Sequence, residues 1–320
     1  MSSVLLILPD FMIILLGYLL RQFLKNSFFN EGFWKGTEKL VFYVLFPPML
    51  FTSVANAKLS LAEAGTFLSV GIAAMMGGVL FSYAIRLFIK GDGVTHASAF
   101  HCGFRFNTYI GFAIVSRLYG QEGLALMSLL IAFWVPISNT IAVSALARAV
   151  AKKEETGSRT SKQPSVLRTV LTNPLIIATL AGLAVNMSGL TLPDTGVRFL
   201  RHLGNASLSM GLLCIGAGLQ FGEIRAHRRL IAASAADRLL VVPVIALAVC
   251  RLFSLPPLET GVAVLFAALP TAQSCYVMTA AMKGNAPAVA GVTTAQTLAA
   301  MATIPFWIAI VLLPLSEMLR

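Results

Sequence analysis

Two short stretches of the chain place polar side chains in otherwise apolar surroundings. They are FRFNTYIG at 104–111 and ALPTAQSC at 268–275. Hydroxyl, amide and guanidinium groups of this kind bind small polar molecules, and an arginine among them favours an anion. The candidate substrate-binding residues are Arg105, Asn107, Thr108, Tyr109, Pro270, Thr271, Gln273 and Ser274.

Arg105 needs a partner or an aqueous cavity if it lies inside a membrane. Burying an arginine there costs at least about 2.5–3.5 kcal/mol on insertion scales. Its partner could be Asp237 or a substrate carboxylate, and the sequence leaves both open. Asp237 and His101 are the candidates for carrying a coupling proton or sodium ion, although a lone histidine more often bridges helices. We expect Arg238 to extend its long side chain to the cytoplasmic edge.

Metal, cofactor and enzyme chemistry find little support in the sequence. The four cysteines fall in four different apolar blocks without CxxC spacing, which supports neither a disulfide framework nor a zinc site. HExxH, GxSxG and Walker-type phosphate loops do not occur, and GAGLQF at 216–221 lacks the third glycine of a dinucleotide fingerprint. We therefore expect no cofactor and no metal, and an integral membrane enzyme is the weaker alternative.

The elements that carry these residues must lie in lipid. Fifty-seven per cent of the 320 residues are apolar and 12% are charged, whereas a soluble domain has roughly 25% charged residues. The apolar residues form blocks of about twenty, the length a helix needs to cross a bilayer. The first block, at 4–24, lacks a basic n-region and a cleavage site, and reads as a retained span. The net charge of +11 comes from basic residues that lie in short loops between the apolar blocks, so no nucleic-acid partner is indicated.

The pattern predicts ten transmembrane helices in an all-α fold. One long polar interval, at 151–168, divides the chain into a first five-helix repeat (1–150) and a second (169–320), and we expect it to be a cytoplasmic linker. The predicted spans are about 4–24, 36–56, 62–88, 95–118, 123–148, 169–189, 197–221, 229–253, 259–282 and 286–314.

Positive charge predicts the orientation of these spans. With both termini outside, the cytoplasmic loops hold 16 Lys and Arg residues and the outer loops and ends hold six. Five spans per half is an odd number, so the second half enters the membrane in the opposite sense and the halves form inverted repeats. Two pairs of residues recur at an offset of 165: Pro9 with Pro174, and Gly17 with Gly182.

Spans four and nine occupy corresponding places in the two halves, and both contain helix-breaking or polar residues near their middle. An offset of 164 aligns Asn107 with Thr271, next to Pro270. Irregular backbone at membrane depth survives only inside protein or along a cavity. We therefore predict that both helices are broken, near Asn107 and Pro270, and cross at the membrane midplane. Ordinary kinks are expected at Pro47, Pro48, Pro136, Pro243 and Pro305.

The chain resembles the auxin efflux carrier family, whose bacterial members include malonate and malate carriers. The resemblance rests on motifs in order along nearly the whole chain: FRFNTYIG, RLYGQEGLAL at 117–126, NPLIIATLAGLAVNMSGLTLP at 173–193, LGNASLSMGLLCIGAGL at 203–219, ALPTAQ at 268–273 and TIPFW at 303–307. It implies two inverted five-helix repeats with helices four and nine crossing at the midplane, and Asn107 and Pro270 match the crossover positions. Gly111 is followed by Phe112 and Ala113, where family members often have a proline.

Together these features predict a secondary active transporter of a small organic anion, a mono- or dicarboxylate, working by alternating access with proton or sodium coupling. The expected location is the inner membrane, in contact with lipid, with both termini periplasmic. A homodimer is an open alternative to a monomer. A membrane sensor or scaffold without transport is the alternative function, in which the polar residues of spans four and nine would be dispensable.

Overall fold

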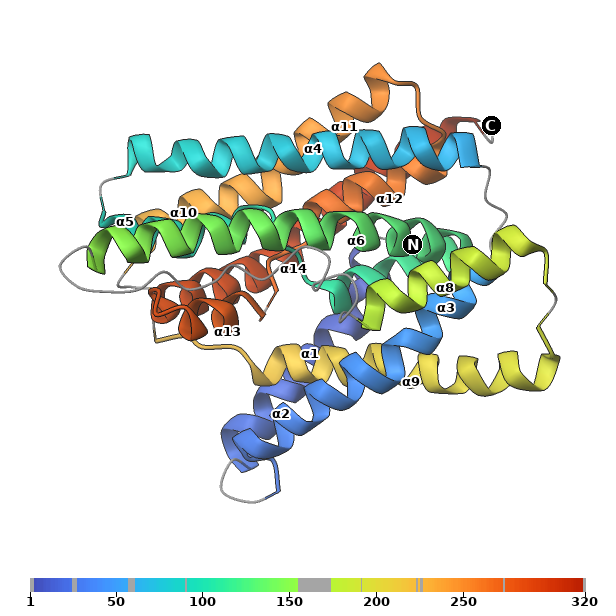
Figure 1. Ribbon diagram of the computed structural model, residues 1–320, viewed down its shortest axis with the longest axis horizontal. Helices are drawn as coiled ribbons and strands as arrows, with labels where there is room; N and C mark the ends of the chain where they lie inside the picture. Colours follow the sequence, from blue (N-terminus) through green and yellow to red (C-terminus); the bar gives the residue numbers. More distant parts are fainter. Residues whose placement is uncertain are drawn as a thin grey trace. The chain divides into compact units, whose positions relative to one another are not determined.

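Every regular element in the described part of the chain is a helix. The computed structural model describes residues 3–24, 28–56, 61–89, 91–154, 174–190, 192–222, 224, 227–272 and 274–318 (Figure 1). The elements in chain order are α1 (Ser3–Leu24), α2 (Glu31–Leu40), the π-helix η1 (Val41–Leu45), α3 (Phe46–Ala55), α4 (Leu61–Phe88), α5 (Gly93–Phe100), the 3₁₀ turn η2 (His101–Gly103), α6 (Thr108–Glu154), α8 (Pro174–Ser188), α9 (Asp194–Ala217), α10 (Arg228–Ala236), the π-helix η3 (Asp237–Val241), α11 (Val242–Leu252), α12 (Pro257–Ala268), α13 (Ser274–Ala281) and α14 (Ala286–Met318).

The helices have the length and surface of membrane spans. Five stretches of the described chain are long and apolar enough to cross a bilayer, and α8 and α12 are shorter apolar helices. Large apolar side chains point outward, among them Phe23, Phe88 and Leu252, which are 76%, 82% and 79% exposed. Such a surface suits lipid rather than water. The predicted all-α membrane protein is confirmed, whereas the number of ten spans and their inverted repeat remain predictions.

The chain forms two compact units that differ from its two predicted halves. Unit 1 comprises Met1–Leu68, Tyr109–Phe133 and Leu167–Leu219, and unit 2 comprises Ser69–Thr108, Trp134–Val166 and Gln220–Arg320. Each unit therefore takes segments from both sides of the polar interval at 151–168. Helix α6 runs through both units and contains a sharp bend at Gly120, whose φ of 57° suits glycine.

Glycines allow helix backbones to touch in unit 1. A Cβ on Gly17 of α1 would lie 2.1 Å from the carbonyl oxygen of Leu213 in α9, and a Cβ on Gly182 of α8 would lie 2.7 Å from that of Phe51 in α3. Contact between these helix pairs is extensive, as expected for membrane helices with small residues at their interface. The two glycines are one of the pairs that recur at an offset of 165.

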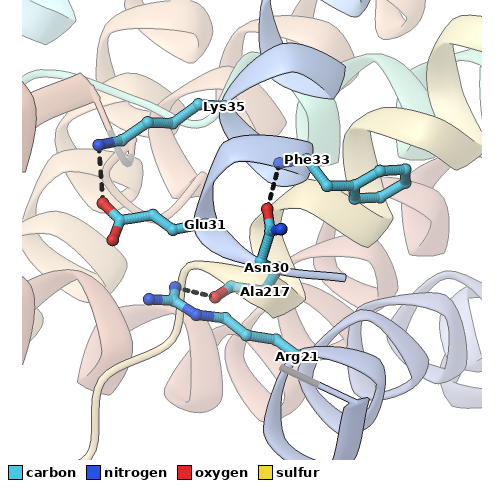
Figure 2. A network of polar contacts seen from close by, with 6 residues as sticks. All are labelled: Arg21, Asn30, Glu31, Phe33, Lys35 and Ala217. Carbon is cyan, nitrogen blue, oxygen red and sulfur yellow. Dashed lines mark hydrogen bonds and ion pairs between the residues drawn. The ribbon is translucent and has the colours of Figure 1, made fainter. Parts of the chain in front are cut away.

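Helix α2 of unit 1 begins with a side-chain cap (Figure 2). The Asn30 Oδ1 atom accepts a hydrogen bond of 2.9 Å from the backbone N–H of Phe33, which satisfies one of the free donors of the first turn. Glu31 and Lys35 form an ion pair of 2.7 Å on the same helix, with side chains 70% and 69% exposed. Such an exposed pair adds little stability.

An arginine from another helix ends α9. The guanidinium of Arg21, in the last turn of α1, donates a hydrogen bond to the carbonyl oxygen of Ala217, the final residue of α9 (Figure 2). The last carbonyls of a helix lack partners and carry partial negative charge, so a cation is favourable there. This contact ties α1 and α9 together at one end.

In unit 2, several helices pack against α14. It contacts α5, α10, α12 and α13, and α11 packs against α12. Helix α4 approaches α11 through Gly78, where an added Cβ would lie 2.6 Å from the Val242 side chain. The candidate residues at 104–108 and 268–275 lie in this unit.

Three of the prolines predicted to kink helices follow π-helical turns. The π-helix η1 directly precedes Pro47 and Pro48 in the first turn of α3, and η3 precedes Pro243 in the first turn of α11. A proline cannot donate to the preceding turn, and one extra residue in that turn is a common local solution. The polar residues Asp237 and Arg238 lie within η3.

Candidate functional site

The first predicted helix interruption is present at 104–107. Helix α5 ends in the 3₁₀ turn η2, four residues leave the helical path, and α6 begins at Thr108. Two hydrogen bonds hold the break: Trp134 Nε1 donates to the Phe104 carbonyl oxygen at 2.9 Å, and the Arg105 N–H donates to the His101 carbonyl oxygen at 3.0 Å. The Trp134 side chain is fully buried, so the break is held by the core of unit 2.

The second interruption lies at 269–272, between α12 and α13, and it contacts the first. The N–H of Asn107 donates a hydrogen bond of 2.7 Å to the carbonyl oxygen of Pro270. The N–H of Thr271 donates to the Oε1 atom of Gln296 at 2.9 Å. The breaks predicted near Asn107 and Pro270 are thus both observed and joined, while the prediction that they lie at the membrane midplane remains untested.

Gln296 is a residue of this site that the sequence reasoning missed. Its side chain is fully buried in α14, where Nε2 donates to the backbone oxygen and hydroxyl of Ser234 at 3.1 and 3.2 Å. One amide therefore connects α10, α14 and the second break. A glutamine in the middle of an apolar span was the available signal, because such a group must find partners.

Arg238 does not extend to the cytoplasmic edge, so that prediction is wrong. Its side chain is fully buried, and the guanidinium closes the end of α12. Nη2 donates to the Phe266 carbonyl oxygen at 2.9 Å and Nε donates to that of Leu269 at 2.6 Å. In a continuous helix Phe266 would accept from residue 270, but Pro270 has no N–H. The unpaired carbonyls at the end of α12 explain why a buried arginine is favourable at this position.

Asp237 is fully buried in η3. Its carboxylate oxygens accept no hydrogen bond within the described part of the chain. The carboxylate and the Ser82 hydroxyl both lie against Gly103, which has no side chain to separate them, but that hydroxyl donates to the Phe100 carbonyl oxygen at 2.8 Å. Ser82 and Arg238 are therefore the polar neighbours of this carboxylate, and no ion pair to it is found among the described residues.

Arg105 is partly exposed, and its guanidinium contacts neutral groups. Nη2 donates to the Ser274 hydroxyl at 3.1 Å and Nη1 to the Met278 sulfur at 3.5 Å. The ion pairs found among the described residues are Glu31 with Lys35 and Asp10 with Arg117, so the alternative in which Arg105 is locked to Asp237 is not observed.

The remaining candidate residues occupy different places. Thr108 is the first residue of α6 and is half-buried, and Tyr109 belongs to unit 1, where its ring stacks on Phe46 with centroids 5.0 Å apart. Thr271 is fully buried, with its hydroxyl 3.1 Å from the Cys275 sulfur. Gln273 lies outside the described residues.

His101 and two cysteines lie together in unit 2. The Nε2 atom of His101 is 3.0 Å from the Thr279 hydroxyl. Cys102 and Cys275 belong to one core cluster of this unit. The sequence separates the two cysteines into distant spans, and only the contact between the two interruptions brings them together.

The electrostatics of the two interruptions favour an anion. Each break ends at a helix N-terminus, α6 at Thr108 and α13 at Ser274, and the free N–H groups of a helix N-terminus carry partial positive charge. The Arg105 guanidinium adds a full positive charge beside Ser274. Backbone N–H groups and a guanidinium are the donors that bind carboxylates.

Comparison with known proteins agrees with this helical arrangement. A family model described as "Membrane transport protein" matches residues 2–308. The chain belongs to this family, the auxin efflux carrier family of membrane transporters. No curated protein matches the chain. The protein is therefore a multi-pass membrane protein of a transporter family.

Proposed function

We propose that the protein is a secondary active transporter of a small organic anion, a mono- or dicarboxylate, which works by alternating access in the inner membrane. The observation that carries this proposal is the Arg105 guanidinium, which lies at the first interruption and donates to the neutral groups of Ser274 and Met278 among the described residues. A positive charge inside a membrane protein is expensive unless an anion compensates it. A transported carboxylate would supply that compensation.

The proposed substrate site is built from the edges of the two breaks. Arg105 and Ser274 would contact a carboxylate directly, and the helix N-termini at Thr108 and Ser274 would add partial positive charge. Asn107, Thr271 and Gln273 are further candidates for polar contacts, and Pro270 shapes the second break. A second carboxylate would be held by these neutral donors, so the proposal covers both mono- and dicarboxylates.

Asp237 is the proposed carrier of the coupling ion. Support comes from its burial and from the lack of an ion pair to its carboxylate among the described residues. We prefer a proton to sodium, because a carboxylate holds a proton without help, whereas sodium needs several oxygen ligands. His101 remains an untested candidate for the same role.

The inverted repeat is part of the proposal. The glycine pair supports it, since Gly17 of the first half and Gly182 of the second each admit the backbone of a neighbouring helix. These contacts join α1 to α9 and α8 to α3. In the proposed numbering they are span one with span seven and span six with span two, a relation that a two-fold repeat predicts.

Binding of carboxylates to the purified protein tests the proposed site. We expect malonate or malate to raise the thermal unfolding temperature of the wild-type protein, and Arg105→Ala to abolish the effect while the protein stays folded. Arg105→Lys should retain weaker binding, because it keeps the charge but loses the planar fork of donors. Arg201→Ala removes an exposed arginine of α9 and serves as the control. Equal carboxylate binding by Arg105→Ala and wild type would contradict the proposal.

A further inference from the structure

Three potential metal ligands meet in the core of unit 2. A ring nitrogen of His101 and the sulfurs of Cys102 and Cys275 all lie within 4.8 Å of one another. All three side chains are fully buried, with exposed fractions of 0%. His101 and Cys102 lie in η2, just before the first interruption, and Cys275 lies in α13, just after the second.

We propose that His101, Cys102 and Cys275 bind a thiophilic divalent cation of the Zn²⁺ and Cd²⁺ class. Three points within 4.8 Å of one another always share a point no more than about 2.8 Å from each, close to the Zn–S and Zn–N distances of about 2.3 and 2.0–2.1 Å. Each ligand atom would thus move by less than about 1 Å to reach bonding distance. Two thiolates and one imidazole are the ligands that such ions select over magnesium or calcium.

The hydrogen bonds of Thr279 leave His101 ready to act as a ligand. The Thr279 hydroxyl donates its proton to the Cys275 carbonyl oxygen at 2.8 Å. At 3.0 Å from His101 Nε2, the same hydroxyl must therefore accept from that nitrogen, so the tautomer of the neutral ring that fits here has its proton on Nε2. The lone pair then resides on Nδ1, a buried atom without a hydrogen-bond partner among the described residues. Histidines that bind metals are held in this way by a partner of the other ring nitrogen.

The charge balance of the site suits its surroundings. Binding one divalent cation releases the two thiol protons to solvent, and the resulting complex of two thiolates, one neutral imidazole and one ion carries no net charge. A neutral complex avoids most of the cost of burying an ion away from water. Thr271 also lies at the site, with its hydroxyl 3.1 Å from the Cys275 sulfur, and is a candidate for a fourth ligand or a hydrogen-bond donor to the thiolate.

A bound ion would join the segments on either side of the two interruptions, because its ligands come from η2 and α13. This inference does not depend on the proposed substrate. It concerns unit 2 alone, and a metal would bind whether or not a carboxylate is transported.

Titration of the purified, tag-free, full-length protein with Cd²⁺ under a non-thiol reductant tests the site. We expect the ultraviolet charge-transfer band of cadmium–thiolate bonds to saturate at one ion per chain, with release of protons and a rise in thermal unfolding temperature. Cys102→Ser and Cys275→Ser should each weaken binding by at least about tenfold. That is the lower limit of the effect usual for outer partners of a metal site, and the loss of a direct ligand should cost no less. Thr279→Val should weaken it by about tenfold, because His101 loses its orienting partner.

Two other buried cysteines provide matched controls. Cys214 and Cys250 are also free and buried, and Cys214→Ser and Cys250→Ser should bind Cd²⁺ as the wild type does. If a serine variant fails to fold, Cys102→Ala and Cys275→Ala replace it, since alanine leaves no buried hydroxyl unpaired. Absence of the band in the wild-type protein, or its equal loss in all four serine variants, would overturn the proposal.

Discussion

Arginine side chains end helices in both units, in each case by donating to carbonyls that the helix cannot satisfy. Arg21 does so for Ala217 at the end of α9, and Arg238 does so for Phe266 and Leu269 at the end of α12. The second case has the clearer cause, because Pro270 removes the donor that would otherwise pair with Phe266. Arg238, whose charge is costly to bury, thus stabilises the break after α12 by pairing with carbonyls that would otherwise lack a donor.

Arg238→Met should destabilise the protein by about 2–4 kcal/mol, since two buried carbonyls would lose their donors at about 1–2 kcal/mol each. Arg238→Lys should restore part of the loss, because an ammonium cannot span both oxygens as the guanidinium does. Thermal unfolding in detergent measures both. Arg251→Met, which removes an exposed arginine from the last turn of α11, is the control. Equal stability of Arg238→Met and Arg251→Met would show that the contacts to α12 contribute nothing.

The wrong prediction for Arg238 has a physical explanation. From sequence alone, each side chain is placed according to its own solvation preference. An arginine without a known partner in a span is expected to extend toward water, which lowers its free energy. The carbonyls that hold Arg238 belong to α12, and they are free only because of Pro270 in that helix. Cys102 and Cys275 illustrate the same limit, because their proximity depends on how two broken helices meet.

Among the helices, the two interruptions could be predicted from the sequence, whereas the residues that hold them in place could not. Pro270 removes a donor, and a run of polar residues follows it, so a break could be located from local chemistry. The same holds for Asn107 within FRFNTYIG. Trp134, which lies beyond the bend of α6, and Gln296 of α14 hold the two breaks in place from distant positions in the sequence and give only a weak local signal.

The glycine contacts of unit 1 permit a test of helix packing. Gly17→Ala and Gly182→Ala should each destabilise the protein by about 1–3 kcal/mol, because the added methyl group would overlap a neighbouring backbone carbonyl. Gly36→Ala in α2 is the control, since an added Cβ there meets no atom within 4 Å. Thermal unfolding of the three variants is the measurement. If Gly17→Ala and Gly182→Ala are as stable as Gly36→Ala, the close approach of α1 to α9 and of α8 to α3 is wrong.

At the scale of the whole molecule, sequence halves and compact units divide the chain differently. Unit 1 contains α1, α2 and α3 from before the polar interval at 151–168 and α8 and α9 from after it. Helices α5, α12, α13 and α14 belong to unit 2. An interleaved arrangement of this kind is expected when two repeats contribute equivalent helices to each unit, so the inverted repeat stays a prediction with which these units agree.

The proposed topology leads to a direct expectation. Both termini should be periplasmic and residues 151–168 cytoplasmic, because positive charge concentrates in the loops that this orientation places inside. A phosphatase fused after Arg320 should be active, and a cytosolic fluorophore inserted near residue 160 should be bright. The reverse pattern of reporters would remove the basis for an inverted repeat.

Counterflow in proteoliposomes tests directly whether the protein transports an organic anion through the site at the two interruptions. Vesicles that contain the purified protein and are preloaded with unlabelled malonate or malate should accumulate the labelled anion transiently from outside. Arg105→Ala should abolish this exchange, and the control Arg201→Ala should retain it. Asp237→Asn should retain exchange but lose accumulation driven by a proton gradient, because only net coupled transport requires the titrating carboxylate. Counterflow that is unchanged in Arg105→Ala would contradict transport of an organic anion through the site at the two interruptions.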